Sequence, residues 1–361
     1  MSLVAFSDPA TAQQLLDKIM NAAKALGHVK IMEVCGTHTM EIGRLGLRSL
    51  LPKNVELVSG PGCPVCVTPG SYIDAAADIA LSHKAIIVTY GDMVRVPGIR
   101  TSLDEAKSKG AAVEVVASPL QALHIAKASP DHQVVFLTVG FETTTPASAK
   151  AILNAKHDGV KNLSFFVSHK IVPPALSALI SDKALEISGF LLPGHVSAII
   201  GQKPYQFIAN EGLPGVITGF EPLDILSGIL MVCDMVSHNK AAILNAYTRI
   251  ARPEGNPKAQ KTVFSVFEIA DSLWRGIGML PMSGLVLKKE YRKFDAQDRF
   301  GIPHVSDDDM PKACSCGDVL KGRLRPNGCP LFSKTCTPEN PVGPCMVSSE
   351  GSCAAYYRYG A

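Results

Sequence analysis

Eight short apolar runs recur between residues 29 and 218, and each ends in a cluster of Gly, Pro or polar residues. The stretches between the runs are long enough for a helix. Continuous apolar runs of this kind are typical of parallel strands that are buried on both faces. We therefore expect an α/β protein built from βα units. The predicted strands are residues 29–34, 55–58, 85–89, 113–117, 134–138, 163–167, 190–192 and 216–218.

An equal division of these strands predicts two parallel-sheet domains that follow each other along the chain. We expect the first domain in residues 1–125, the second in residues 126–235, and a helical segment with a cysteine-rich C-terminal domain in residues 236–361. Apolar residues at helical spacing predict helices over 9–26 and 225–250. Ligands of such sheets bind beyond the carboxyl ends of the strands, where the polar motifs of this chain lie. The two domains are therefore expected to face a central cleft.

Composition excludes several classes of function. The chain has 361 residues, of which 47% are hydrophobic, and its net charge is only +3. No block of consecutive Lys and Arg is present, so nucleic-acid binding is not expected. Residues 1–10 lack the pattern of a secretory leader, and no apolar run approaches the roughly 18 residues that span a bilayer. We therefore expect a soluble, cytoplasmic protein without membrane contact.

The ten cysteines are concentrated at two places in the sequence. In a cytoplasmic protein their thiols are expected to be reduced, which favours metal or redox chemistry over structural disulfides. Cys35, Cys63 and Cys66 lie near the start, and six more lie in the last fifty residues. Cys233 stands alone in a predicted helix, where a small core residue is the ordinary interpretation.

The first group of cysteines lies in two loops that follow predicted strands. Cys63 and Cys66 belong to the Gly- and Pro-rich loop 60–70, and such a C-x-x-C pair can be a redox dithiol, half of a zinc site or two ligands to a softer metal. Cys35 and His38 place a thiol beside an imidazole, either as nucleophile and base or as metal ligands. If the two loops meet, three sulfurs with open coordination positions suit an iron that carries other ligands.

The second group contains more thiols than one metal centre needs. A 4Fe-4S cluster takes four thiolates, and the tail contains six thiols. Structural zinc is the alternative. Zinc sites usually show two C-x-x-C pairs, whereas in this tail only Cys314 and Cys316 are close together in the sequence. An iron-sulfur cluster is favoured, and it is expected to stabilise a tail that is poor in large apolar residues.

Further polar residues follow the predicted strands of the second half: Glu142, residues 143–145, His169, His195 and Glu221. Each could be a helix cap or a satisfied loop residue. Their repetition at successive strand ends favours a functional role.

Five segments together resemble the HypD family of NiFe-hydrogenase maturation factors. They are CGTH (35–38), GPGCPVC (60–66), GFETT (140–144), PGHVS (193–197) and the tail PVGPCMVSSEGSCAAYY (341–357). The resemblance implies a scaffold with redox activity on which the Fe(CN)2CO unit is assembled together with a HypC-type chaperone and a HypE-type cyanide donor. It implies that Cys35 binds the iron, with Cys63 and Cys66 beside it and His38 nearby.

The tail also resembles that of ferredoxin:thioredoxin reductase. This resemblance implies a 4Fe-4S cluster held by Cys314, Cys329, Cys336 and Cys353, with Cys316 and Cys345 as a redox-active pair. Electrons would pass from the cluster through this pair to Cys63 and Cys66, and then to ligands on the iron at Cys35. The alternative function is a stand-alone iron-sulfur thiol-disulfide oxidoreductase that acts on protein partners. The protein by itself is expected to be a monomer.

Overall fold

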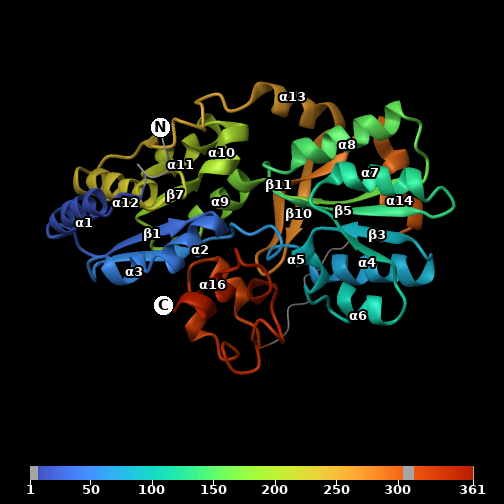
Figure 1. Cartoon of the computed structure of the whole chain (residues 1–361). Coiled ribbons are helices and arrows are strands. Elements are labelled where there is room, and N and C mark those ends of the chain that lie inside the picture. Colours follow the sequence, from blue (N-terminus) through green and yellow to red (C-terminus); the bar gives the residue numbers. More distant parts are fainter. Residues whose placement is uncertain (1–6, 304–312, 361) are drawn as a thin grey trace.

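Two parallel β-sheets lie side by side in the computed structural model, which describes residues 7–303 and 313–360 (Figure 1). Residues 1–6, part of the segment in which no leader pattern was found, lie outside the described residues. The first sheet has the order β2-β1-β7-β8-β9, and the second has the order β4-β3-β5-β6. The strands are β1 (Val29–Glu33), β2 (Val55–Ser59), β3 (Ile86–Thr89), β4 (Val113–Val115), β5 (Val134–Gly140), β6 (Leu163–His169), β7 (Gly189–Pro193), β8 (Gly215–Thr218) and β9 (Ile243–Asn245).

All eight predicted strands are present close to their predicted bounds, and each pairs in parallel with its neighbours. Every residue of β5 and β7 is buried, as expected for strands covered on both faces. The predicted α/β class is therefore confirmed.

The grouping of the strands differs from the predicted one. The first sheet combines β1 and β2 with β7, β8 and β9, whereas β3 to β6 form the second sheet. The expected division into two consecutive groups of four strands is therefore wrong, and boundaries at residues 125 and 235 do not separate the sheets. Consecutive strands are neighbours in most α/β folds, but here the chain leaves the first sheet after β2 and returns to it at β7.

Helices cover the sheets, and no helix among the described residues is long and apolar enough to cross a membrane. The first sheet separates two hydrophobic clusters: Ile31 of β1 belongs to the one shared with α1 and α12, and its neighbour Met32 belongs to the other. The helices are α1 (Pro9–Ala23), α2 (Gly36–Arg44), α3 (Leu47–Leu50), α4 (Gly70–Ser82), α5 (Gly91–Val94), α6 (Leu103–Ser108), α7 (Pro119–Ala128), α8 (Thr145–His157), α9 (Val172–Ile180), α10 (Gly194–Ile200), α11 (Gln206–Asn210), α12 (Pro222–Ser237), α13 (Pro257–Val266), α14 (Ala296–Phe300), α15 (Cys316–Leu320) and α16 (Ser352–Tyr359).

The helix predicted over residues 225–250 is shorter in the structure. Helix α12 ends at Ser237, and Asn239 has a positive φ of 49° that cannot continue a helix. The apolar residues that follow form β9 at the edge of the first sheet. Cys233 is fully buried in α12, which agrees with its interpretation as a small core residue.

An antiparallel hairpin and the cysteine-rich tail complete the fold. The hairpin consists of β10 (Phe267–Trp274) and β11 (Gly278–Leu287), and β11 packs beside β6. The tail, residues 313–360, lies below the junction of the two sheets in Figure 1. Its last helix, α16, packs against α2, while the Arg95 side chain after α5 donates to the Pro338 carbonyl. The tail therefore contacts parts of the chain that belong to both sheets.

Candidate functional site

The CGTH and GPGC motifs lie against each other at the carboxyl ends of β1 and β2. Cys35 directly precedes α2, and the Gly36 backbone N–H donates to the Gly62 carbonyl at 3.0 Å. A Cβ atom at position 62 would lie 1.6 Å from the Val34 carbonyl oxygen. Only glycine allows this close approach of the two backbones. Neighbouring parallel strands thus bring the two cysteine-bearing loops together, because their carboxyl ends lie at the same edge of the sheet.

Cys63 and Cys66 form a disulfide, which differs from the reduced thiols expected from the sequence. Their Cα atoms are 5.3 Å apart, within the usual range for a disulfide. Both residues are buried, with 3% and 0% of their surface exposed. Because the thiolate is the form of cysteine that binds metal, these two sulfurs can become iron ligands only after the disulfide is reduced.

The Cys35 thiol lies under the C-terminal tail. Burial raises the pKa of Cys35 to about 11, and the Glu350 carboxylate adds to the rise. Glu350 also accepts a hydrogen bond from Thr37 Oγ1 at 2.6 Å. The contact is close, since a Cβ atom at Gly36 would come within 2.5 Å of the Glu350 carbonyl oxygen. The tail thus covers the start of α2, and the free thiol is protonated near neutral pH.

His38 links the CGTH motif to the carboxyl end of β8. Its Nε2 lies 2.9 Å from the Gly219 carbonyl oxygen and 3.0 Å from Thr218 Oγ1. A carbonyl oxygen can only accept, so Nε2 carries the proton. Nδ1 has no hydrogen-bond partner among the described residues, and burial lowers the pKa of His38 to about 4. The rings of His38 and His195 both contact Phe220, with centroid separations of 4.7 and 4.2 Å.

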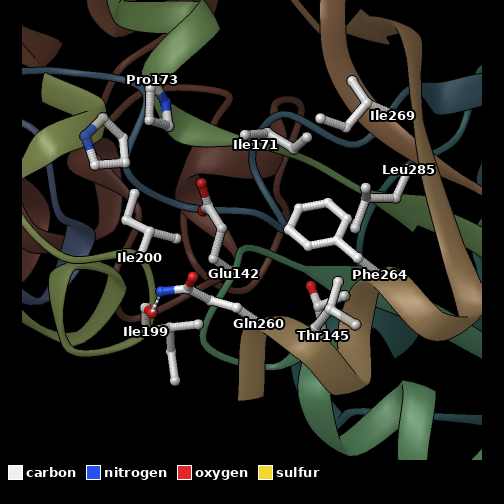
Figure 2. Close-up of a pocket in the computed structure, with 12 residues that line it drawn as sticks. Glu142, Thr145, Ile171, Pro173, Ile199, Ile200, Gln260, Phe264, Ile269 and Leu285 are labelled. Atoms are coloured by element: carbon white, nitrogen blue, oxygen red, sulfur yellow. Dashed lines mark hydrogen bonds between the residues drawn. The ribbon is translucent and has the colours of Figure 1, made fainter. Parts of the chain in front are cut away.

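Glu142 of the GFETT motif lies at an apolar pocket of about 200 Å³ (Figure 2). Its Oε1 accepts a hydrogen bond from the Val172 backbone at 3.0 Å, whereas Oε2 has no partner in the part of the chain that the structure describes. Burial raises the pKa of Glu142 to about 7. The pocket is lined by residues that follow β5, β6 and β7, which belong to both sheets, but it does not include the cysteines or the strand-end histidines that the predicted cleft was expected to gather. Its remaining lining is Thr145, Ile171, Pro173, Ile199, Ile200, Pro204, Gln260, Val263, Phe264, Ile269 and Leu285.

Other polar residues at strand ends make local contacts. The hydroxyls of Thr144 and Thr145 both donate to the carbonyl of the residue after β5, at 3.1 and 2.9 Å. Glu221 precedes α12 and exchanges capping hydrogen bonds with Asp224. His169 Nδ1 lies 3.3 Å from the last carbonyl of β5, and burial lowers the pKa of its imidazole to about 4. Glu221 is therefore a helix cap, whereas the two threonines make local hydrogen bonds without capping α8.

The six tail cysteines line one cavity. The Cys316 and Cys345 sulfurs are 3.4 Å apart, and Cys314 forms a hydrogen bond with Cys316. The chain passes close to these sulfurs, because a Cβ atom at Gly343 would lie 2.8 Å from the Cys314 sulfur. The cysteines that line the cavity are Cys314, Cys316, Cys329, Cys336, Cys345 and Cys353.

This set of donors fits an iron-sulfur cluster. Among the described residues, no three His, Cys, Asp or Glu side chains are placed to hold a single metal ion. Six sulfurs around one cavity are nevertheless the ligand type that such clusters take, and four thiolates suffice for a 4Fe-4S cluster.

The disulfide and the tail thiols share one hydrophobic core. Cys63, Cys66, Cys316 and Cys345 all belong to the same buried cluster as Trp274. The core therefore brings the sulfur atoms of the first sheet and of the tail into a common apolar environment.

Two charged residues near the sulfurs were missed by the sequence analysis. Arg275, which follows Trp274, is fully buried, and Glu350 approaches Cys35 from the tail. Glu350 lies between Cys345 and Cys353 in the tail segment 341–357. This position was the only feature of the sequence that could have indicated a functional role for it. Nothing in the sequence around Arg275 indicated a functional role for this residue.

These features define a class of protein: an α/β protein in which a buried disulfide and a six-thiol tail converge near one partly buried cysteine. The family model of HypD, described as the hydrogenase formation hypA family, matches residues 10–360. The hydrogenase maturation factor HypD of Rhodobacter capsulatus is 44% identical over 98% of this chain and 97% of its own length.

Two further relatives show similar agreement. The hydrogenase maturation factor HypD of Azotobacter vinelandii is 44% identical over 98% of this chain and 96% of its own. A putative hydrogenase expression/formation protein of Methanocaldococcus jannaschii is 40% identical over 99% of both chains. The chain belongs to the HypD family.

Proposed function

We propose that the protein is a NiFe-hydrogenase maturation factor, a scaffold that binds iron at Cys35 and on which the Fe(CN)2CO unit is assembled. Family membership supports the role in maturation. The observation that carries the iron site is the backbone contact between the Cys35 loop and the Cys63–Cys66 loop, beneath the tail. A thiolate is a soft ligand, which suits an iron that also binds CO and cyanide.

The thiols of the chain are proposed to carry electrons to this site. When bound, a 4Fe-4S cluster would supply electrons to the neighbouring sulfurs. The Cys316 and Cys345 thiols, 3.4 Å apart, are close enough to form a disulfide as the Cys63–Cys66 disulfide is broken. This exchange moves two electrons and two protons, so it balances without a further reactant. The cluster ligands in this proposal are the four remaining tail cysteines, Cys314, Cys329, Cys336 and Cys353.

Once reduced, Cys63 and Cys66 become additional thiol ligands beside Cys35. His38 is a candidate proton carrier, since its Nδ1 is unpartnered among the described residues. The proposed partners are a HypC-type chaperone and a HypE-type cyanide donor, and the proposed location is the cytoplasm, with the protein a monomer when alone.

The alternative, a thiol-disulfide oxidoreductase that acts on protein partners, is less well supported by the geometry. Exchange requires that the attacking thiolate reach a disulfide sulfur. At 3% and 0% exposure, Cys63 and Cys66 cannot be reached by the thiol of a folded partner without rearrangement. The tail pair, which shares their core, is the donor that the geometry favours.

Infrared spectroscopy on the anaerobically purified complex with a HypC-type partner tests the proposal. Iron in excess of the cluster, together with CO and cyanide bands, is expected for the wild type. Cys35→Ala should lose these bands, and Cys35→Ser should lose them as well, because a hydroxyl is a harder ligand that stays protonated. Cys233→Ala, which changes an isolated core cysteine, should keep them. Normal bands in Cys35→Ala would contradict the iron site, and a wild type with thiol exchange but no extra iron would favour the alternative.

A further inference from the structure

Arg275 is a fully buried arginine at the meeting of three segments of the chain. It follows β10, and its backbone N–H donates to the Val67 carbonyl at 2.9 Å, directly after the Cys63–Cys66 loop. On its other side the chain contacts the tail: a Cβ atom at Gly276 would lie 2.8 Å from the Gly317 Cα, next to Cys316. Arg275 therefore stands between the two sets of cysteines.

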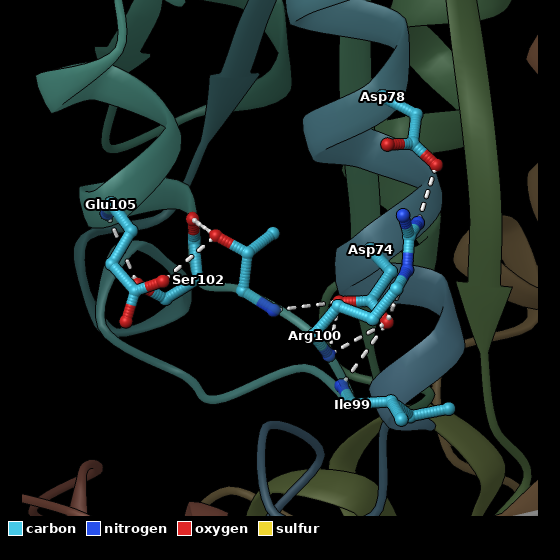
Figure 3. Close-up of polar contacts among 7 residues, drawn as sticks. Asp74, Asp78, Ile99, Arg100, Ser102 and Glu105 are labelled. Atoms are coloured by element: carbon cyan, nitrogen blue, oxygen red, sulfur yellow. Dashed lines mark hydrogen bonds and ion pairs between the residues drawn. The ribbon is translucent and has the colours of Figure 1, made fainter.

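A rigid loop positions the guanidinium. Arg275 Nη1 donates to the Pro97 carbonyl at 2.7 Å. The Asp74 carboxylate holds this loop by accepting hydrogen bonds from the backbone N–H groups of residues 99, 100 and 101, at 3.1 to 3.2 Å (Figure 3). Three backbone donors on one buried carboxylate leave the loop little freedom, so the carbonyl that receives Arg275 is fixed.

The guanidinium of Arg275 is only partly hydrogen-bonded in the part of the chain that the structure describes. Its Nε and Nη2 atoms have no hydrogen-bond partner there, and no carboxylate forms an ion pair with it. Burying an unpaired charge is costly, and a native structure normally avoids it by pairing. An anion close to the guanidinium would remove this cost.

Thiolates of the tail cysteines are the anions that we expect near this charge. Gly276, the residue after Arg275, meets Gly317 beside Cys316, and Trp274, the residue before it, belongs to the same buried cluster as Cys316 and Cys345. Both chain neighbours of Arg275 therefore pack beside cysteines that line the tail cavity.

We propose that Arg275 is the counter-charge of the sulfur centre in the tail and that it makes this centre easier to reduce. The inference rests on the proposed function, because it takes the centre to be an iron-sulfur cluster held by thiolates. Reduction adds negative charge to the centre, and a fixed positive charge in an apolar core stabilises the added electron more than it would in water. Arg275 is a positioning residue here, since it acts on the sulfurs and not on the substrate iron.

The test is the midpoint potential of the cluster, measured by redox titration followed by visible absorbance in the full-length protein. Arg275→Met and Arg275→Gln both remove the charge: methionine suits an apolar site, and glutamine keeps a donor for Pro97, so that one of the two folds. In either variant the cluster should bind the added electron at least tenfold less favourably. For a one-electron couple this lowers the midpoint potential by about 59 mV. Arg275→Lys keeps the charge and should restore most of the potential.

Arg95→Gln is the matched control. Arg95 also contacts the tail, through Pro338, but it is exposed and its charge is solvated, so the potential should not change. An unchanged midpoint in the charge-removing variants would overturn the inference about Arg275 while leaving the cluster in place. A wild-type protein that takes up no cluster would instead overturn the proposed function together with the inference.

Discussion

At the scale of single residues, burial decides the protonation state of the groups around the site. It raises the pKa of Cys35 to about 11 and that of Glu142 to about 7, and it lowers that of His38 to about 4. In each case the apolar environment disfavours the charged form. Near neutral pH the thiol and the imidazole are therefore neutral in the free protein, and the iron binding that we propose at Cys35 would have to displace a proton.

Glu142 leads to a prediction about stability and pH. A carboxyl whose pKa is raised by folding stabilises the fold fully below its ordinary value of 4.5, and this contribution is lost as the pH rises to about 7. Relative to Glu142→Gln, the wild type should lose about 3 kcal/mol of unfolding free energy over this range. Urea unfolding of both proteins from pH 4.5 to pH 8 measures the difference. Glu211→Gln, at an exposed position, is the control, and a difference for Glu142→Gln that does not vary with pH would refute the prediction.

At the scale of secondary-structure elements, the sequence predicted the strands but not their pairing. Each apolar run marks a buried strand because burial on both faces needs a continuous apolar segment. Which strands become neighbours depends on contacts across the whole core. The pairing of β1 with β7 joins residues 31 and 189, and nothing local encodes it. The contact between the two cysteine loops could be predicted only by assuming that β1 and β2 are neighbouring strands.

The contact between these loops predicts a sharp difference between two glycines. Gly62→Ala would place a methyl group 1.6 Å from the Val34 carbonyl oxygen, so the loops must separate, at a cost of about 2 kcal/mol or more. Gly27→Ala has open space around the new methyl group and should change stability little. Thermal and urea unfolding of both variants measure the two costs. Equal stability of the two variants would show that the loops do not touch in solution.

Helices α15 and α16 of the tail are short, so we expect the tail to fold stably only when its cysteines hold a metal centre. Replacing any of the four proposed ligands by Ala should remove the brown chromophore and unfold the tail. Cys316→Ser and Cys345→Ser should keep the chromophore and abolish thiol-disulfide exchange. Visible absorbance and iron content distinguish the two groups, and loss of iron from either serine variant would mean that the ligands and the pair have been interchanged. The variants of the first group are Cys314→Ala, Cys329→Ala, Cys336→Ala and Cys353→Ala.

At the scale of the whole molecule, the tail joins parts of the chain that are far apart in the sequence. Thr37 and Glu350 are separated by 313 residues, yet they share a hydrogen bond of 2.6 Å beside Cys35. The sequence showed which cysteines belong to the tail, since spacing and residue type are local. It could not show that the tail covers Cys35, nor that Arg275 stands between the two sets of cysteines, because both arrangements arise only when the sheets are assembled.

Because the tail covers Cys35, loss of the cluster should change the reactivity of this thiol. In protein that carries the cluster but no iron at Cys35, removing the cluster with a chelator should free the tail and take Glu350 away from Cys35. The pKa of Cys35 should then fall from about 11 towards its ordinary value of 9.0, which raises the thiolate fraction at pH 8 by up to a factor of about 100. Alkylation by iodoacetamide, followed by mass spectrometry of the Cys35 peptide, measures this change, and Cys353→Ala should reproduce it without chelator. Cys233, buried in α12, is the internal control and should stay slow in every sample. An alkylation rate of Cys35 that is the same with and without the cluster would show that the tail does not act as its cover.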